Sequence, residues 1–223
     1  MIYSDCCGTG FSSVCRKCAV SSDRWRPAWQ PCMPMASSIE TSKVGSEGAN
    51  VLVRKNGDLC LADLGLSAKK PSGVAGGFFK PVCTLLYQAP EQLFQTKRGY
   101  DERADVWSLG CIFYELLTGM VFFRSAKSKD QLVHLILKFF GGEEFDEWED
   151  GRDTDLFRRQ QHLLKRQKTV FNHVKSKGID TDALDLLERM CRLNPDRRPT
   201  AAEILLHPFL QHTTAESPEP LSN

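Results

Sequence analysis

Two short apolar runs separated by a turn signal open the patterned part of the chain, which begins near Gly48. Val51–Val53 and Leu59–Ala62 each have the length of a strand, and Asn56-Gly57 lies between them. An Asn-Gly pair between apolar runs is the strongest short-range hairpin signal, because both central residues must adopt positive φ. The pattern therefore predicts a small β-hairpin.

A second pattern, apolar on nearly every side, predicts a helix from Asp105 to Leu117. A helix that is apolar nearly all round belongs in a core. Asp105 is suited to cap its first turn, and Trp107 is expected to pack rather than to bind a ligand. The apolar positions are Val106, Leu109, Ile112, Phe113, Leu116 and Leu117.

The two ends of the chain show neither the alternation of a strand nor the spacing of a helix. Residues 1–47 hold five of the nine cysteines, and residues 213–223 hold two prolines and two serines. These features predict a disordered or non-native leader and a disordered tail. A zinc site beginning at Cys15-x-x-Cys18 is the alternative for the leader. It needs a second pair of ligands at suitable spacing, which Cys6-Cys7 and Cys32 do not supply.

Composition narrows the class of protein. The formal net charge of +1 gives no reason to expect nucleic acid or a membrane surface as a partner. The longest apolar stretch, Leu109–Phe123, is interrupted by Glu115 and is too short to cross a bilayer. The N-terminus does not have the pattern of a signal peptide. Four cysteines in apolar contexts read as reduced core residues of an intracellular protein, cytoplasmic or nuclear: Cys60, Cys83, Cys111 and Cys191.

Two oxygen-bearing side chains flank the predicted hairpin at its open end. Asn50 precedes the first strand and Asp63 follows the second. Amide and carboxylate oxygens held in this way suit Mg²⁺, a hard cation that also takes the phosphates of a substrate.

This segment resembles the magnesium-binding region of eukaryotic protein kinases, with Asp63-Leu64-Gly65 in place of Asp-Phe-Gly. Three further motifs follow in the family's order. Thr84-Leu-Leu-Tyr-Gln-Ala-Pro-Glu91 is similar to the end of the activation segment. Asp105-Val-Trp-Ser-Leu-Gly110 is similar to the start of the central helix, and Asn194-Pro-Asp-Arg-Arg-Pro-Thr200 to the closing helices. The resemblance covers residues 48 to about 212.

The resemblance implies a mainly α fold within an α+β family. It implies the large C-terminal lobe of a kinase with a small β-hairpin, and the small N-terminal lobe is expected to be absent. Thr84 favours a serine/threonine kinase, and the insert at 141–177 favours the group of cyclin-dependent and MAP kinases, although Gln88 stands where that group has arginine. The charge runs in the insert are expected to be a solvated loop and helix face, with a partner-docking site as the alternative.

The resemblance also implies structural roles for four residues. Glu91 and Arg198 are expected to form a buried ion pair, and Asp105 to cap the backbone of the catalytic loop. Thr84 is expected to connect the substrate-binding segment to the catalytic base. No serine or threonine stands in the usual place of an activating phosphorylation just before Thr84, so Phe78 and Phe79 are expected to pack that segment down instead.

The catalytic machinery that the family requires is missing upstream. The base stands five residues before the metal-binding Asn in kinases, and here that position is Gly45, which cannot accept a proton. Glu47 replaces the lysine that normally supports the transferring phosphate. Between Ser21 and Asn50 there is no room for the other parts of a nucleotide-binding lobe.

The sequence therefore predicts a serine/threonine kinase domain, truncated and inactive as this chain alone. The family reaction is transfer of the ATP γ-phosphoryl group to protein hydroxyls with Mg²⁺, and Asn50 and Asp63 are expected to be vestigial metal ligands that bind ATP and Mg²⁺ poorly. Expected partners are protein substrates or docking proteins, with no nucleic acid and no membrane. Two alternatives stay open: a pseudokinase-like binding module, or a misassembled gene product without a function of its own.

Overall fold

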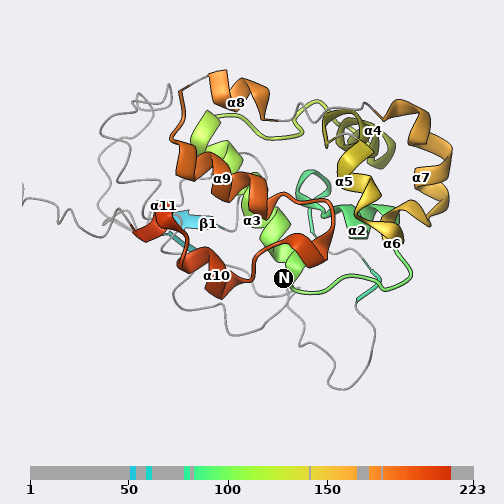
Figure 1. Cartoon of the computed structure of the whole chain (residues 1–223), viewed down its shortest axis with the longest axis horizontal. Helices are drawn as coiled ribbons and strands as arrows, with labels where there is room; N and C mark the ends of the chain where they lie inside the picture. Colours follow the sequence, from blue (N-terminus) through green and yellow to red (C-terminus); the bar gives the residue numbers. More distant parts are fainter. Residues whose placement is uncertain are drawn as a thin grey trace, which may run out of the picture.

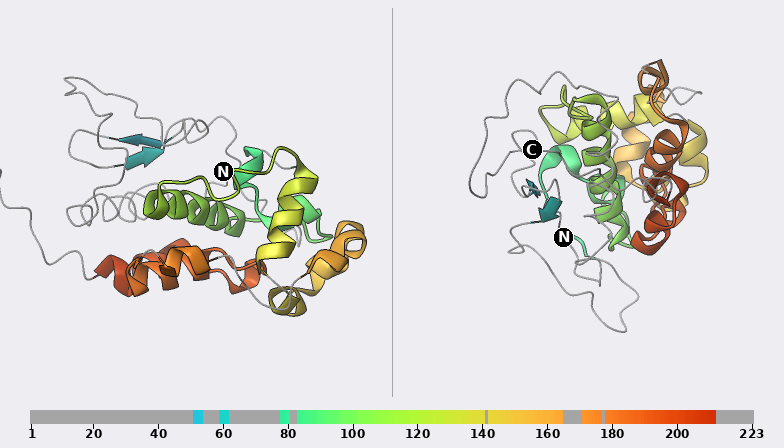
Figure 2. Two further views of the ribbon diagram at one scale, coloured as in Figure 1. Left: turned by 90° about the horizontal axis from the view of Figure 1, so that it is seen from above. Right: turned by 90° about the vertical axis from the view of Figure 1, so that its left-hand side faces the viewer.

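The computed structural model describes residues 51–53, 59–61, 78–80, 83–140, 142–164, 171–176 and 178–211. The expected leader at 1–47 and tail at 213–223 lie outside these residues, as do Gly45, Asn50 and Asp63. What is described is mostly helical, with one small sheet (Figures 1 and 2). In this part of the chain no helix is both long and apolar enough to cross a membrane.

The sheet consists of strands β1 (Val51–Val53) and β2 (Leu59–Leu61), which pair antiparallel (Figure 2). Val51 lies opposite Leu61, and Val53 lies opposite Leu59. The expected Asn56-Gly57 turn between these strands lies outside the described residues.

The helices follow in the order of the chain. The first are η3 (Leu85–Tyr87), α2 (Pro90–Phe94), α3 (Arg103–Thr118) and α4 (Lys129–Phe140). The insert holds α5 (Gly142–Asp146), α6 (Glu149–Arg152), α7 (Asp155–Gln160), η4 (Gln161–Leu163) and α8 (Asn172–Ser176). The chain closes with α9 (Thr181–Met190), η5 (Pro195–Arg197), α10 (Ala201–Leu205) and α11 (Pro208–Gln211).

Helix α3 runs through the centre of the lobe and packs along α9 (Figures 1 and 2). The two helices approach closely at Gly110. A Cβ at this position would lie 2.6 Å from Cys191 Sγ and 3.2 Å from Met190 Cβ. Only a residue without a side chain fits there, so Gly110 sets the distance between the two helices.

The start of α3 corrects one expectation. The helix begins at Arg103, and Asp105 lies inside the first turn, where its N–H donates to Glu102 O at 3.1 Å. Asp101 takes over part of the capping, because its Oδ1 accepts the N–H of Arg103 at 3.0 Å. The prediction that Asp105 caps α3 was therefore wrong.

The core is built from aromatic rings around α3. Trp107 is fully buried, as expected for a packing residue, and lies near Phe123 and Phe140 at centroid distances of 6.3 and 5.5 Å. Helix α4 adds an apolar face with helical spacing, made of Leu132, Val133, Ile136, Leu137 and Phe140, all fully buried. Each side chain of this size contributes roughly 1.5–3 kcal/mol on burial.

Local signals fix the last helices. Asp180 Oδ1 accepts the N–H groups of Asp182 and Ala183 at 2.9 and 3.0 Å and so caps α9. A capping box starts α10, in which Thr200 Oγ1 accepts from Glu203 N and Glu203 Oε2 accepts from Thr200 N. Each cap satisfies N–H groups that a helix N-terminus leaves without partners.

Candidate functional site

The segment that resembles the end of an activation segment is held on α3 from two sides. Tyr87 Oη donates to Glu115 Oε2 at 3.0 Å, and Ser108 Oγ donates to the carbonyl of Tyr87 at 2.8 Å. Burial raises the pKa of Glu115 above its ordinary value of 4.5, although the hydrogen bond from Tyr87 lowers it. Residues 85–87 are thereby fixed to the central helix.

Two glutamine side chains hold the backbone on either side of residues 85–87. Gln88 Nε2 donates to the carbonyl of Cys83 at 2.8 Å, and Gln92 Oε1 accepts from Ala89 N at 2.9 Å. Cys83 Sγ lies 3.8 Å from the same oxygen of Gln92. Burial raises the pKa of the Cys83 thiol to about 11, so the thiol stays protonated and unreactive at neutral pH.

Glu91 and Arg198 lie 107 residues apart in the chain and meet in a buried, bidentate ion pair. Arg198 Nη1 donates to Glu91 Oε1 and Nη2 to Oε2, both at 2.7 Å. The side chains are 0% and 2% exposed for Arg198 and Glu91, respectively. A fork-to-fork contact of this kind fixes direction as well as distance.

All five N–H groups of the Arg198 guanidinium have acceptors. Besides the two bonds to Glu91, Nε donates to Arg192 O at 2.7 Å, Nη1 to Arg103 O at 2.9 Å and Nη2 to Leu193 O at 3.1 Å. The guanidinium carbon also lies 5.3 Å from the centroid of the Trp107 ring. The pair thus connects α2, the start of α3 and the turn after α9.

The remaining predicted residues lie apart from this pair. Thr84 is exposed, and its carbonyl accepts the N–H of Tyr87 at 3.0 Å at the start of η3. Asp105 is half-buried in the first turn of α3. Gly45, Asn50 and Asp63 lie outside the described residues, so the expected metal ligands and base position stay predictions.

Phe78 and Phe79 behave differently from each other. Phe78 pairs with Tyr100 through two backbone hydrogen bonds of 2.7 and 2.8 Å, and their rings lie 5.8 Å apart. Phe79 is 63% exposed and does not pack the segment down. Backbone pairing directs neighbouring side chains to opposite faces. The expectation for Phe79 was therefore wrong.

The charged insert contains a cluster of buried aromatic residues, which we did not predict from its charge pattern. Phe145, Trp148 and Phe157 are buried, and Phe94 of α2 meets the first two edge-on at 5.7 and 5.6 Å. The acidic side chains around them are mostly exposed, as a solvated helix face requires. The sequence signal for the cluster was the pair of aromatic residues at i and i+3 inside the acidic run.

Comparison with known proteins agrees with this architecture. A family profile described as the protein kinase domain matches residues 48–210, and the chain belongs to this family. It is of the serine/threonine type and of the group that contains cyclin-dependent and MAP kinases, as the resemblance indicated.

Three relatives illustrate the relationship. The CTD kinase subunit alpha of Schizosaccharomyces pombe is 33% identical over 177 residues, which is 78% of this chain and 28% of the relative. Cyclin-dependent kinase 12 of Caenorhabditis elegans is 35% identical over 176 residues, 75% of this chain and 23% of the relative. Mitogen-activated protein kinase HOG1 of Wallemia muriae is 33% identical over 175 residues, 78% of this chain and 60% of the relative. The chain thus spans less than two thirds of these relatives.

The family implies ATP and Mg²⁺ as cofactors. Within the described ranges, no group of three or more His, Cys, Asp or Glu side chains is placed to hold a metal ion. In the part of the chain that the structure describes, the Tyr87–Glu115 and Glu91–Arg198 contacts fix residues 85–94 to α3 and to the turn after α9.

Proposed function

We propose that this chain is the large lobe of a serine/threonine protein kinase domain that does not, by itself, transfer the ATP γ-phosphoryl group to protein. The observation that carries the proposal is Gly45 at the position of the catalytic base. Glycine has no group that can accept the proton of a substrate hydroxyl. The proposal concerns the activity of these 223 residues.

The magnitudes support an inactive chain. Loss of general-base help typically costs about 10²–10⁴-fold in rate. The family also positions ATP with a glycine-rich loop and a strand lysine, neither of which residues 1–47 supply in recognisable form. Positioning and electrostatic stabilisation provide nearly all of phosphoryl-transfer catalysis, so the two losses compound.

Radiolabelled ATP with dephosphorylated casein as acceptor tests the proposal. We expect no incorporation above the level of an Asp63→Ala variant, which serves to detect a contaminating kinase. Turnover near the ~1–100 s⁻¹ of ordinary kinases that Asp63→Ala abolishes would overturn the proposal.

We also propose that this chain binds ATP with Mg²⁺ more weakly than about 1 mM, which corresponds to a binding free energy of only about −4 kcal/mol. Asn50 and Asp63 alone would leave the adenine uncovered and much of the phosphate charge unpaired. Calorimetric titration measures this directly. A micromolar affinity lost in Asp63→Ala would show that the chain holds a nucleotide site.

A second candidate function is a binding module for protein partners inside the cell, in the cytoplasm or nucleus. The described part of the charged insert favours it, because Phe145 and Trp148 pack against Phe94 and so fix that surface to α2. Binding of a partner by the purified chain, undisturbed by Asp63→Ala, would support this candidate over a gene product without a function.

A further inference from the structure

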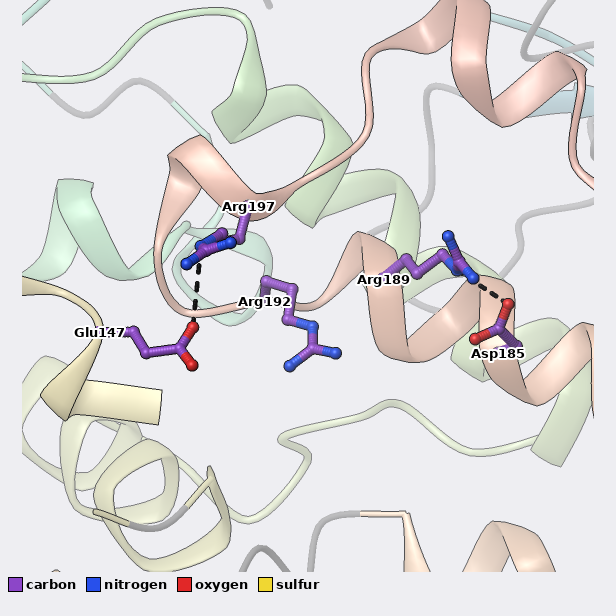
Figure 3. Close-up of a pocket in the computed structure, with 5 residues that line it drawn as sticks. All are labelled: Glu147, Asp185, Arg189, Arg192 and Arg197. Carbon is purple, nitrogen blue, oxygen red and sulfur yellow. Dashed lines mark hydrogen bonds and ion pairs between the residues drawn. The ribbon is translucent and has the colours of Figure 1, made fainter. Parts of the chain in front are cut away.

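An arginine-lined hollow lies on the part of the lobe where α9, the turn before η5 and the α5–α6 connection meet. It is lined by two residues of α9, one of the turn after α9, one of η5 and one of the connection (Figure 3), and its volume is about 450 Å³. This volume lies within the range of about 300–1,000 Å³ usual for ligand sites. The lining residues are Asp185, Arg189, Arg192, Arg197 and Glu147, which we call the arginine hollow.

Arg192 occupies the middle of the hollow. Figure 3 shows its guanidinium between the Arg197–Glu147 pair on one side and the Arg189–Asp185 pair on the other. Its Nη1 donates to Glu144 Oε1 at 3.0 Å, and this is its one side-chain bond to the described residues. Most of its five N–H donors therefore remain for a ligand.

The two flanking arginines are also incompletely used. Arg189 Nε donates to Asp185 Oδ2 at 2.8 Å, which leaves both terminal nitrogens without a partner in the described part of the chain. Arg197 Nε lies 3.7 Å from Glu147 Oε2, too far for a hydrogen bond. Their side chains are 57% and 65% exposed, so both can turn toward a ligand.

The walls of the hollow are held in place by other contacts. Asn194 Nδ2 donates to Glu147 O at 2.8 Å, and Leu193 N donates to Glu144 Oε2 at 3.3 Å. Asp185 also faces His207 Nε2 at 3.0 Å, so its carboxylate keeps a partner if Arg189 turns away. Burial raises the pKa of Asp185, but hydrogen bonds from His207 and Arg189 outweigh it and lower the pKa below its usual range.

The unused guanidinium N–H groups of the hollow favour one kind of ligand. Its lining holds three arginines and two carboxylates, and Glu144 beside Arg192 adds a third carboxylate, so the charges balance and the free N–H groups are what a ligand can engage. A monovalent carboxylate would gain little over the carboxylates already present. A dianion with three oxygens can accept from several guanidinium forks at once.

We propose that the arginine hollow binds a phosphorylated serine or threonine side chain of a protein partner. Among the described residues, those that line the hollow are all ionisable and include no aromatic or aliphatic side chain. A nucleotide would find no ring on which to stack its base, and an acyl chain would find no apolar wall. A phosphorylated side chain needs neither, because its recognition rests on charge and hydrogen bonds.

The hollow also connects to the buried ion pair. The carbonyl of Arg192, whose side chain lies in the hollow, accepts from Arg198 Nε at 2.7 Å. The backbone that carries two of the three arginines is therefore held by the Glu91–Arg198 pair. The inference deepens the binding-module candidate and does not depend on catalytic inactivity, since the hollow contains none of the family's catalytic positions.

Fluorescence anisotropy on the full chain tests the proposal. The probe is a fluorescein-labelled peptide with one phosphoserine among glycine and serine residues, measured against its unphosphorylated twin. We expect the phosphopeptide to bind at least about tenfold tighter, equal to about 1.4 kcal/mol. Affinity should fall as salt rises, because exposed charges are screened.

Matched double variants separate the hollow from general charge. Arg189→Gln with Arg197→Gln removes two charges from the hollow, leaves the Arg192–Glu144 pair intact and should weaken phosphopeptide binding at least about tenfold. Arg152→Gln with Arg158→Gln removes the same charge from exposed positions on the insert outside the hollow. This control should change affinity by less than about twofold, or about 0.4 kcal/mol.

Three results would overturn the proposal. One is equal binding of the phosphorylated and unphosphorylated peptides. Another is an equal loss in the control variant, which would indicate general electrostatic attraction. The third is binding of phosphatidylcholine vesicles containing a phosphoinositide, through the same arginines, without binding of the phosphopeptide. Kinase activity of the chain would refute only the proposed inactivity, so the two failures are distinguishable.

Discussion

Truncating Arg198 to alanine should destabilise the lobe by about 3–5 kcal/mol, the usual cost of removing one partner of a buried ion pair. The structure supports the upper part of this range. Glu91, 2% exposed, would lose both of its bonds to Arg198, and the carbonyls of Arg192, Leu193 and Arg103 would each lose a donor. Trp107 would lose the cation over its ring.

This cost is large relative to the stability of a domain, which is typically about 5–15 kcal/mol. A domain of 150–250 residues loses about 2–4 °C in Tm per kcal/mol, so Arg198→Ala should lower the Tm by about 6–20 °C. Thermal unfolding followed by circular dichroism measures the shift. The control is Arg152→Ala, which removes an exposed pair with Asp146 at 3.2 Å and should cost less than about 1 kcal/mol.

A double variant separates the charge from the packing. Replacing Glu91 with leucine and Arg198 with methionine removes both charges and keeps much of the volume. We expect it to recover much of the loss of Arg198→Ala, because no buried charge remains unpaired. A Tm for Arg198→Ala that falls no further than that of Arg152→Ala would refute the reasoning.

Three further predictions concern the core. Glu115→Gln should raise the Tm at neutral pH. The folded-state pKa of Glu115 lies above 4.5, so the stability that Glu115 confers is lost as the pH rises through that pKa. The Gln side chain carries no charge and can still accept the hydrogen bond from Tyr87. The advantage of Gln should shrink below pH ~4.5, and a pH-independent difference in Tm would contradict it. Gly110→Ala should cost about 1–3 kcal/mol in urea denaturation, since its Cβ would lie 2.6 Å from Cys191 Sγ, and adding Cys191→Ala should restore part of this. The isolated chain should unfold below about 60 °C and should associate in sedimentation experiments, because apolar side chains on α3 are only half-buried. A monomer that unfolds cooperatively above that temperature would refute this prediction.

Local sequence signals specified a large part of this protein. The ordered kinase motifs were sufficient to assign the family that the comparison shows. The apolar run on α3 predicted a core helix, and Trp107 is buried as expected. These inferences succeed because each depends on residues within a few turns of one another, where periodicity and motif spacing are direct consequences of backbone geometry.

Capping shows where local signals reach their limit. Asp105 and Asp101 both precede or open an apolar run and both are able to cap a helix. In the structure Asp101 Oδ1 accepts the N–H of Arg103, where α3 begins two residues before Asp105, and Arg198 Nη1 donates to the carbonyl of Arg103. No pattern inside residues 101–105 contains that contact.

The candidate sites depend on residues that only tertiary folding brings together. Tyr87 meets Glu115 across 28 residues, and Arg198 reaches Glu91 across 107. The arginine hollow joins α9 to a connection in the insert, and no local pattern in the sequence between them specifies that contact. The sequence determined which side chains exist and which local elements form. The packing of α3, α9 and the insert decided which of those side chains share a surface, because that depends on directions set by the whole core.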